Sequence, residues 1–193
     1  DALRRGVIDS NPAAHIRVRP GAVDVEDDWL RAEEIDALLG CESIPLRNRT
    51  VYACAIGLAL RLNDLKGLRV ADVHLDAKVP GPHVRVRIAK SGKKHRVPVL
   101  PWLEPWLRAH LEALPEDATW LFPNRDGERY RKHHDFNWAS KRERTGTHKD
   151  GTPRWRVSPG ALERAGVERR IRFHDLRGTC ATHLALGTWG RAW

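Results

Sequence analysis

The spacing of apolar and polar positions predicts a mostly helical chain. Apolar residues recur at helical spacing in 29–39, where acidic residues occupy the first turn and Gly40 provides a stop. The segment 49–60 is apolar on all sides, which is typical of a buried central helix. Shorter or less regular patterns predict further helices at 63–68, 101–114, 160–166 and 172–186.

Strand patterns lie between these helices. The segment 84–89 alternates apolar and polar residues, and 95–99 returns after a turn that contains Lys90. Pro98 favours an edge position for the returning strand, because proline donates no hydrogen bond to a neighbour. Together with a first strand at 70–75, these segments predict a small antiparallel sheet with a basic hairpin tip, and therefore an α+β domain.

The pattern is weakest, and the positive charge strongest, in the last third of the chain. The segment 142–156 is rich in Arg, Lys, Gly and Thr, and we expect an exposed loop there. A short helix is a candidate at 137–139. Residues 124–177 contain fifteen Lys and Arg against eight Asp and Glu, whereas 24–42 contains eight acids and one base. The acidic segment is typical of a solvated helix face.

The overall charge indicates a polyanionic partner, since the chain carries a net charge of +9 with a pI of about 10.0. The alternative is an ordinary basic protein. The sequence has no apolar run of the roughly 18 residues that would span a bilayer and no signal-peptide pattern. Because the chain starts at Asp1 and contains no methionine, we expect it to be part of a longer protein.

The three cysteines are widely separated and odd in number, which favours a reducing compartment over a disulfide framework or a zinc site. We expect Cys54 and Cys180, which lie in apolar runs, to be small core residues. Cys41 lies outside these runs.

The first candidate for chemistry is Arg61, which follows the predicted buried helix and precedes Asp64 by three residues. An arginine at the end of a buried element is costly unless its charge is used. A structural ion pair between Arg61 and Asp64 is the alternative, and these residues alone favour it.

The second candidate is Lys90, at the tip of the predicted hairpin and close to Lys93 and Lys94. A lysine on its flexible stem can reach a bound phosphodiester. The alternative, which Lys90 alone favours, is a solvated lysine that discourages the pairing of strand edges.

The third candidate is the pair His174 and Arg177, which share a helix face because they are three residues apart. The guanidinium can donate two parallel hydrogen bonds to a phosphate, and the imidazole can donate or exchange a proton. The alternative is a histidine at a helix start followed by an exposed arginine. These two readings are about even.

In their order along the chain, these residues resemble the tyrosine recombinase (phage integrase) family. His174 with Arg177 resembles its His-x-x-Arg motif, Arg61 with Asp64 its Arg-x-x-Glu/Asp motif, and Lys90 the catalytic lysine of its β-hairpin. Ala59 departs from the family, where glycine is commonest. Further matching segments are Leu121-Phe122-Pro123, Gly6-Val7-Ile8 and Asn11-Pro12.

The resemblance implies a domain organisation. Residues 28–193 would form the catalytic domain, mostly helical with a small antiparallel β-sheet or hairpin at one edge, and 1–27 would be the tail of a preceding core-DNA-binding domain with its linker. The family's nucleophilic tyrosine lies beyond His-x-x-Arg. Neither Tyr52, in the buried helix, nor Tyr130, in a basic loop, fits its place, so we expect the chain to be truncated before the nucleophile and inactive.

The chemistry implied by the resemblance is site-specific DNA recombination or integration. A tyrosine attacks the phosphorus to give a 3′-phosphotyrosyl link, which stores the bond energy so that no ATP is needed. Arg61 and Arg177 would stabilise the phosphate charge, Lys90 would protonate the leaving oxygen, and His174 would hydrogen-bond the phosphate or help to accept the tyrosine proton. No metal or other cofactor is implied.

The implied partners are double-stranded DNA and other recombinase protomers, with no membrane and no small-molecule substrate. The implied location is the cytoplasm, for a protein encoded by a bacterium or a phage. Three alternatives stay open: a catalytically inactive DNA-binding fragment or relative, a topoisomerase-like strand nickase, and a basic helical domain with coincidental motifs. The expected DNA-binding residues are Lys93, Lys94, Arg142, Arg144, Lys149, Arg154 and Arg156.

Overall fold

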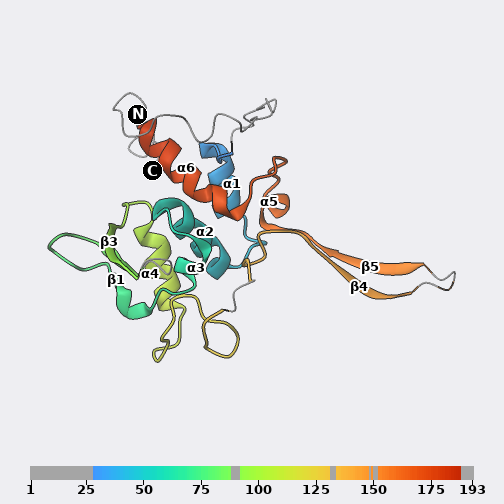
Figure 1. Ribbon diagram of the computed structural model, residues 1–193, viewed down its shortest axis with the longest axis horizontal. Helices are drawn as coiled ribbons and strands as arrows, with labels where there is room; N and C mark the ends of the chain where they lie inside the picture. Colours follow the sequence, from blue (N-terminus) through green and yellow to red (C-terminus); the bar gives the residue numbers. More distant parts are fainter. Residues whose placement is uncertain (1–27, 88–91, 131–133, 148, 150–151, 188–193) are drawn as a thin grey trace, which may run out of the picture.

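The computed structural model describes residues 28–87, 92–130, 134–147, 149 and 152–187. Helices and a small three-stranded sheet form a body, and a two-stranded hairpin projects from the side of the body opposite to that sheet (Figure 1). This arrangement confirms the expected α+β class. The proposed domain tail at 1–27 lies outside the described residues. No described helix is both long enough and apolar enough to cross a membrane.

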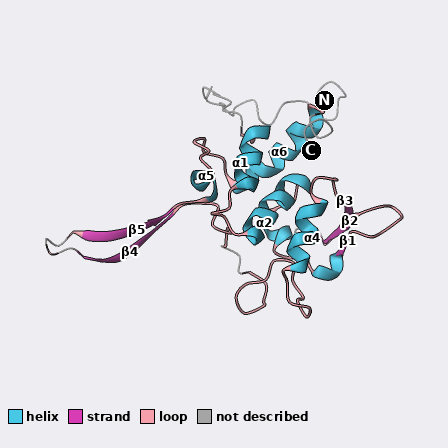
Figure 2. Ribbon diagram, turned by 180° about the vertical axis from the view of Figure 1, so that it is seen from behind, coloured by secondary structure: helices cyan, strands magenta, loops and turns pink. Residues whose placement is uncertain are grey.

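Helix α2, Leu46–Gly57, is the centre of the body. It contacts α1 (Ala32–Gly40) and α6 (Leu176–Ala185) on one side and α4 (Glu104–Glu112) on the other, as Figures 1 and 2 show. Every residue of α2 from Thr50 onward is buried, which confirms the predicted central helix.

Helix α2 ends three residues earlier than predicted, at Gly57. Ala59 has a φ of 51°, a left-handed conformation that stops a helix and favours glycine. Gly57 itself permits a close approach of the chain ahead of α4: a Cβ atom there would lie 3.0 Å from Leu103 and 3.1 Å from Trp102.

The sheet has the order β1-β2-β3 and is antiparallel throughout. Helix α3 (Leu62–Leu65) leads to it. The predicted first strand at 70–75 is wrong in its first half, because Val70–Asp72 form the 3-10 helix η1. The Asp72 carboxylate accepts the backbone N–H of Arg69 (3.1 Å) and closes that turn. The three strands are β1 (Val73–His74), β2 (His83–Arg87) and β3 (Lys94–Pro98).

The prediction of a loop at 142–156 is wrong, although the residues there whose burial the structure describes are exposed, as expected. Strand β4 (Lys141–Thr147) pairs antiparallel with β5 (Pro153–Ser158), with a register shift between Arg144 and Gly146, and the two form the projecting hairpin (Figure 2). The hairpin does not pack against the body, so it lacks the apolar alternation by which a half-buried strand is recognised.

The candidate helix at 137–139 is also wrong. Phe136 and Asn137 have positive φ angles of 54° and 61°, which are incompatible with a right-handed helix. The Asp135 carboxylate accepts the backbone N–H groups of Asn137 (3.0 Å) and Ala139 (3.3 Å), so that a side-chain turn replaces the helix.

The C-terminal part contains α5 (Ala161–Arg164), the 3-10 helix η2 (Phe173–Asp175) and α6. Helix α5 is shorter than predicted and is followed by Gly166, with a φ of 71°. The single helix expected from residue 172 is divided between η2 and α6. Cys54 and Cys180 are buried, as predicted.

Candidate active site

His174 and Arg177 lie on either side of the junction between η2 and α6. His174 belongs to η2 and is exposed, whereas Arg177 is the second residue of α6 and is half-buried. The Nε of Arg177 is buried and has no hydrogen-bond partner within the described structure. Because buried N–H groups are almost always paired, this guanidinium N–H is a donor whose acceptor the described residues do not supply.

Asp175, between these two residues, fixes the entry to α6. Its Oδ2 accepts the Nε (2.9 Å) and the backbone N–H (2.9 Å) of Arg172, and its Oδ1 accepts Nη2 of the same side chain (3.0 Å). Burial raises the pKa of Asp175, but the hydrogen bonds and charge of Arg172 outweigh that effect and bring the pKa below its ordinary value. The carboxylate therefore stays ionised and holds the turn that carries His174.

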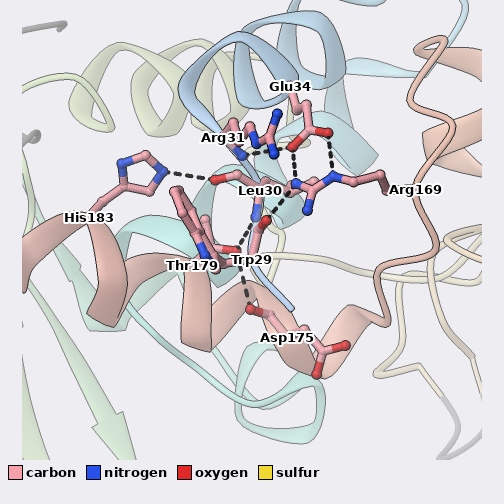
Figure 3. Close-up of polar contacts among 8 residues, drawn as sticks. All are labelled: Trp29, Leu30, Arg31, Glu34, Arg169, Asp175, Thr179 and His183. Carbon is pink, nitrogen blue, oxygen red and sulfur yellow. Dashed lines mark hydrogen bonds and ion pairs between the residues drawn. The ribbon is translucent and has the colours of Figure 1, made fainter. Parts of the chain in front are cut away.

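The first turns of α6 are tied to residues 29–30, which we call the Trp29–Leu30 anchor (Figure 3). The Thr179 hydroxyl donates to the Asp175 backbone oxygen (3.2 Å) and accepts the Leu30 N–H (3.0 Å). His183 Nε2 donates to the Leu30 oxygen (2.8 Å), and the Trp29 and His183 rings meet edge to face at 5.3 Å. These contacts fix the α6 backbone in the turns that follow Arg177.

An ion pair between Arg169 and Glu34 also holds the Trp29–Leu30 anchor. Arg169 donates from Nε to Glu34 Oε1 (2.8 Å) and from Nη2 to Glu34 Oε2, and it also donates to the Trp29 oxygen (2.8 Å) (Figure 3). The hydrogen bond with Arg169 is the main cause of a lowered pKa of Glu34. The pair therefore joins α1 to the segment that precedes η2.

Arg61 lies at the start of α3 in an extended conformation, and its side chain is exposed. The side chain therefore leaves the buried helix that precedes it and reaches solvent. The alternative of an ion pair with Asp64 is not formed, and no described residue pairs with the Arg61 guanidinium. No hydrogen bond joins Arg61 to His174 or Arg177, but α3 and α6 both contact α2.

The other predicted site residues lie in the two hairpins. Lys90 falls in 88–91, outside the described residues. Lys93 directly precedes β3 and Lys94 begins it, and both are exposed. On the projecting hairpin, Arg154 and Arg156 of β5 and Lys149 of the connecting segment are exposed. Arg142 and Arg144 are residues of strand β4.

Both tyrosines are held by contacts with other side chains, and the Tyr52 ring lies edge to face against Phe173 of η2, with the ring centres 6.3 Å apart. The Tyr52 hydroxyl donates to the Phe136 oxygen (2.6 Å) inside the core, and burial raises the pKa of Tyr52. The Tyr130 ring stacks on His134 at 3.9 Å, with the Arg47 guanidinium 5.4 Å from its centre. Both tyrosine rings therefore take part in packing contacts within the fold.

The structure also contains a groove that sequence analysis missed, with a volume of about 960 Å³. Its lining includes six cationic side chains and one carboxylate, Asp72. A detectable signal was present, since Arg85 and Arg87 alternate with buried valines in the predicted strand. The cations are Arg69, Arg85, Arg87, Lys94, Arg96 and Arg129.

Comparison with known proteins agrees with this fold. The model of the phage integrase family matches residues 28–190. A tyrosine recombinase of Thermosipho africanus is 27% identical over 181 residues, which are 93% of this chain and 55% of that protein. The chain therefore spans about half the length of that relative.

Solved recombinase structures share the arrangement. The crystal structure of XerA recombinase matches with a TM-score of 0.60 at 19% identity, over 82% of this chain and 51% of that chain. A lambda integrase dimer bound to a COC′ core site matches with a TM-score of 0.58 at 19% identity, over 93% of this chain and 46% of that chain. The chain belongs to the phage integrase family, and its fold is that of a tyrosine recombinase catalytic domain.

Proposed function

We propose that this chain is the phosphate-binding part of a site-specific tyrosine recombinase that cuts and rejoins double-stranded DNA. The observation that carries the proposal is the buried, unpaired Nε of Arg177, three residues after the exposed His174 in a chain of the phage integrase family. A phosphodiester oxygen is the partner that such a donor lacks.

The proposed residues divide between charge stabilisation and proton transfer. Arg177 and Arg61 hold the non-bridging oxygens, where negative charge increases in the transition state. The exposure of Arg61, and its lack of a carboxylate partner among the described residues, support its use by a ligand from solvent. His174 hydrogen-bonds the same phosphate or accepts the proton of the nucleophile, and Lys90 protonates the leaving 5′-oxygen.

The nucleophile in this proposal is a tyrosine other than Tyr52 and Tyr130, the two that the sequence contains. Tyr52 is committed to the core by its bond to Phe136, and Tyr130 stacks on His134. The covalent 3′-phosphotyrosyl intermediate would then need a group outside this sequence. On its own, the chain would bind DNA without cutting it.

The proposed partners are duplex DNA and further protomers. Related structures support both: lambda integrase is described as a dimer bound to a COC′ core site and as a tetramer bound to a Holliday junction, and XerH as bound to its difH substrate. The exposed cations of the projecting hairpin, Arg154 and Arg156, are proposed phosphate contacts.

The test combines two assays on the chain. A gel-shift series with duplex DNA measures binding between 50 and 200 mM salt, and a nicked suicide duplex detects any covalent protein–DNA adduct. We expect binding that weakens steeply with salt and no adduct. Absence of binding at the lowest salt would overturn the DNA assignment, and an adduct abolished by Tyr130→Phe would overturn the assignment of the nucleophile.

A further inference from the structure

Helix α3 fixes the backbone of Arg61, although it is only four residues long. The Arg61 oxygen accepts the backbone N–H groups of Asp64 (2.9 Å) and Leu65 (3.0 Å), which makes Arg61 the N-cap of this helix. Isolated helices shorter than about 12 residues are marginal in water, because few backbone bonds offset the cost of nucleation. The position from which the Arg61 side chain reaches solvent therefore depends on contacts from outside α3.

The guanidinium of Arg129 supplies such a contact at the other end of α3. It donates from Nε to the Lys66 oxygen (3.1 Å) and from Nη2 to the Asn63 oxygen (3.2 Å). The backbone N–H groups of residues 66–68 bond to three other oxygens of this turn, so Arg129 pairs two carbonyls that they pass over. A cation at this end is also favoured by the partial negative charge of the last helical carbonyls.

The surroundings of the Arg129 guanidinium fit its planar shape. The guanidinium lies 5.8 Å from the centre of the Trp120 ring, a favourable contact between a cation and an aromatic face. A Cβ atom on Gly67 would lie 3.3 Å from Arg129 Nη2, so the absence of a side chain there leaves room for the guanidinium. A lysine would not replace these contacts, because its ammonium lacks the rigid fork that bonds two acceptors.

The loop that carries Arg129 is closed by its own hydrogen bonds. Asn124 Oδ1 accepts the backbone N–H groups of Asp126 (2.9 Å) and Glu128 (2.8 Å), and the Asn124 N–H donates to the Glu128 oxygen (2.7 Å). Pro123 and Arg129 then form an antiparallel bridge across the loop. The Arg129 backbone is therefore held by this turn, and its side chain transmits that position to α3.

We infer that Arg129 is a positioning residue, which clamps α3 so that Arg61 presents its guanidinium to a DNA phosphate in one place. The inference rests on the proposed function, in which Arg61 holds a phosphate oxygen, and deepens it. Within the described residues no ion pair restrains the Arg61 side chain, so the restraint acts on its backbone. A donor whose backbone is already fixed loses less conformational freedom when it binds.

The test is a double-mutant cycle built on a substitution that conserves charge. Arg129→Lys keeps the positive charge but loses the fork that bonds both carbonyls. It is made in the unchanged chain and in Arg61→Ala, and the affinity of each chain for one duplex of about 30 base pairs is measured at about 50 mM salt. Arg125→Lys, at an exposed arginine of the same loop, is the matched control. Circular dichroism melts verify that every chain is folded.

Arg129→Lys should weaken DNA binding by about fivefold in the unchanged chain and by less than about twofold in Arg61→Ala, because two residues that act as a unit are not additive. Arg125→Lys should change the affinity by less than about twofold in both. A merely structural role of Arg129 would lower the melting temperature without this dependence on Arg61.

Four other outcomes would overturn the inference. Equal weakening in both backgrounds would mean that Arg129 contacts the DNA itself or acts on the whole fold. No weakening in either background would remove the role of Arg129 and leave the proposed function in place. If Arg61→Ala binds as tightly as the unchanged chain, the proposed role of Arg61 fails as well. If the unchanged chain does not bind the duplex, the DNA assignment itself fails.

Discussion

The body around α2 and the projecting β4–β5 hairpin differ in how much of their surface is buried. The body buries α2 almost completely, and the Trp29–Leu30 anchor ties α6 to it through side-chain hydrogen bonds. The hairpin has a backbone ladder and exposed cations at Arg154 and Arg156, and it does not pack on the helices. The body carries the side chains that need a fixed geometry, and the hairpin presents positive charge away from the body.

The largest effect on stability is expected from Tyr52→Ala in the core. The ring makes edge contacts with Trp138 and Phe173, and its hydroxyl bonds to the Phe136 oxygen. Truncation of a buried aromatic residue costs about 3–5 kcal/mol. Urea denaturation measures the loss, and Val157→Ala on the exposed hairpin serves as the control, with a change within about 0.5 kcal/mol. Equal losses would abolish the distinction between the regions.

The second effect is expected from Arg169→Ala, which leaves Glu34 without its charged partner and should cost about 1–3 kcal/mol at pH 7. Because the folded-state pKa of Glu34 is lowered, its contribution is present above its unfolded pKa, near 4.5, and is lost as pH falls through the lower folded value. Stability measured from pH 6 to pH 3 should therefore fall less steeply in the variant. Parallel pH profiles would count against the pair.

Thr179→Val should have a smaller effect, about 1–2 kcal/mol, because it removes the hydrogen bonds to Leu30 and Asp175 and leaves the buried Leu30 N–H unpaired. Thermal melts give the stability change. Thr179→Ser, which keeps the hydroxyl, is the matched control and should recover most of the loss. A serine variant as unstable as the valine variant would show that the methyl group matters rather than the hydrogen bonds.

The smallest change in stability is expected on the hairpin. Arg154→Gln with Arg156→Gln should leave the free energy of unfolding within about 0.5 kcal/mol of the original, because both side chains are exposed. The same variant should lower the salt slope of DNA binding by about 1.8 if both arginines contact phosphates. An unchanged slope in a gel-shift series would remove the hairpin from the DNA-binding surface.

The buried elements could be predicted from the sequence because burial leaves a pattern. Helix α2 and the valines of β2 produced the expected helix and strand, with errors at their ends such as the left-handed Ala59. Strands β4 and β5 could not be predicted in this way, since neither has one face in the core. The turn at Asp135 depends on a side-chain hydrogen-bond pattern that apolar spacing does not record.

In the candidate site as well, some features could be predicted from the sequence and others could not. The predicted single helix that carries His174 and Arg177 is divided, with His174 in η2 and Arg177 in the first turn of α6. The exposure of Arg61 and the Trp29–Leu30 anchor could not be predicted, because they depend on contacts between residues far apart in the chain. The groove lined by six cations was visible in the sequence only in part, as the alternation of Arg85 and Arg87 with valines, because Arg69 and Arg129 join it through the fold.

The central claim is that Arg177 binds a DNA phosphate, and its most direct test is the affinity of Arg177→Ala for duplex DNA at low salt. Arg170→Ala is the matched control, since Arg170 is exposed and forms no hydrogen bond or ion pair with another described residue. Loss of charge-assisted hydrogen bonds should weaken binding by about tenfold or more for Arg177→Ala and by much less for the control. Equal affinities of the two variants would contradict the account.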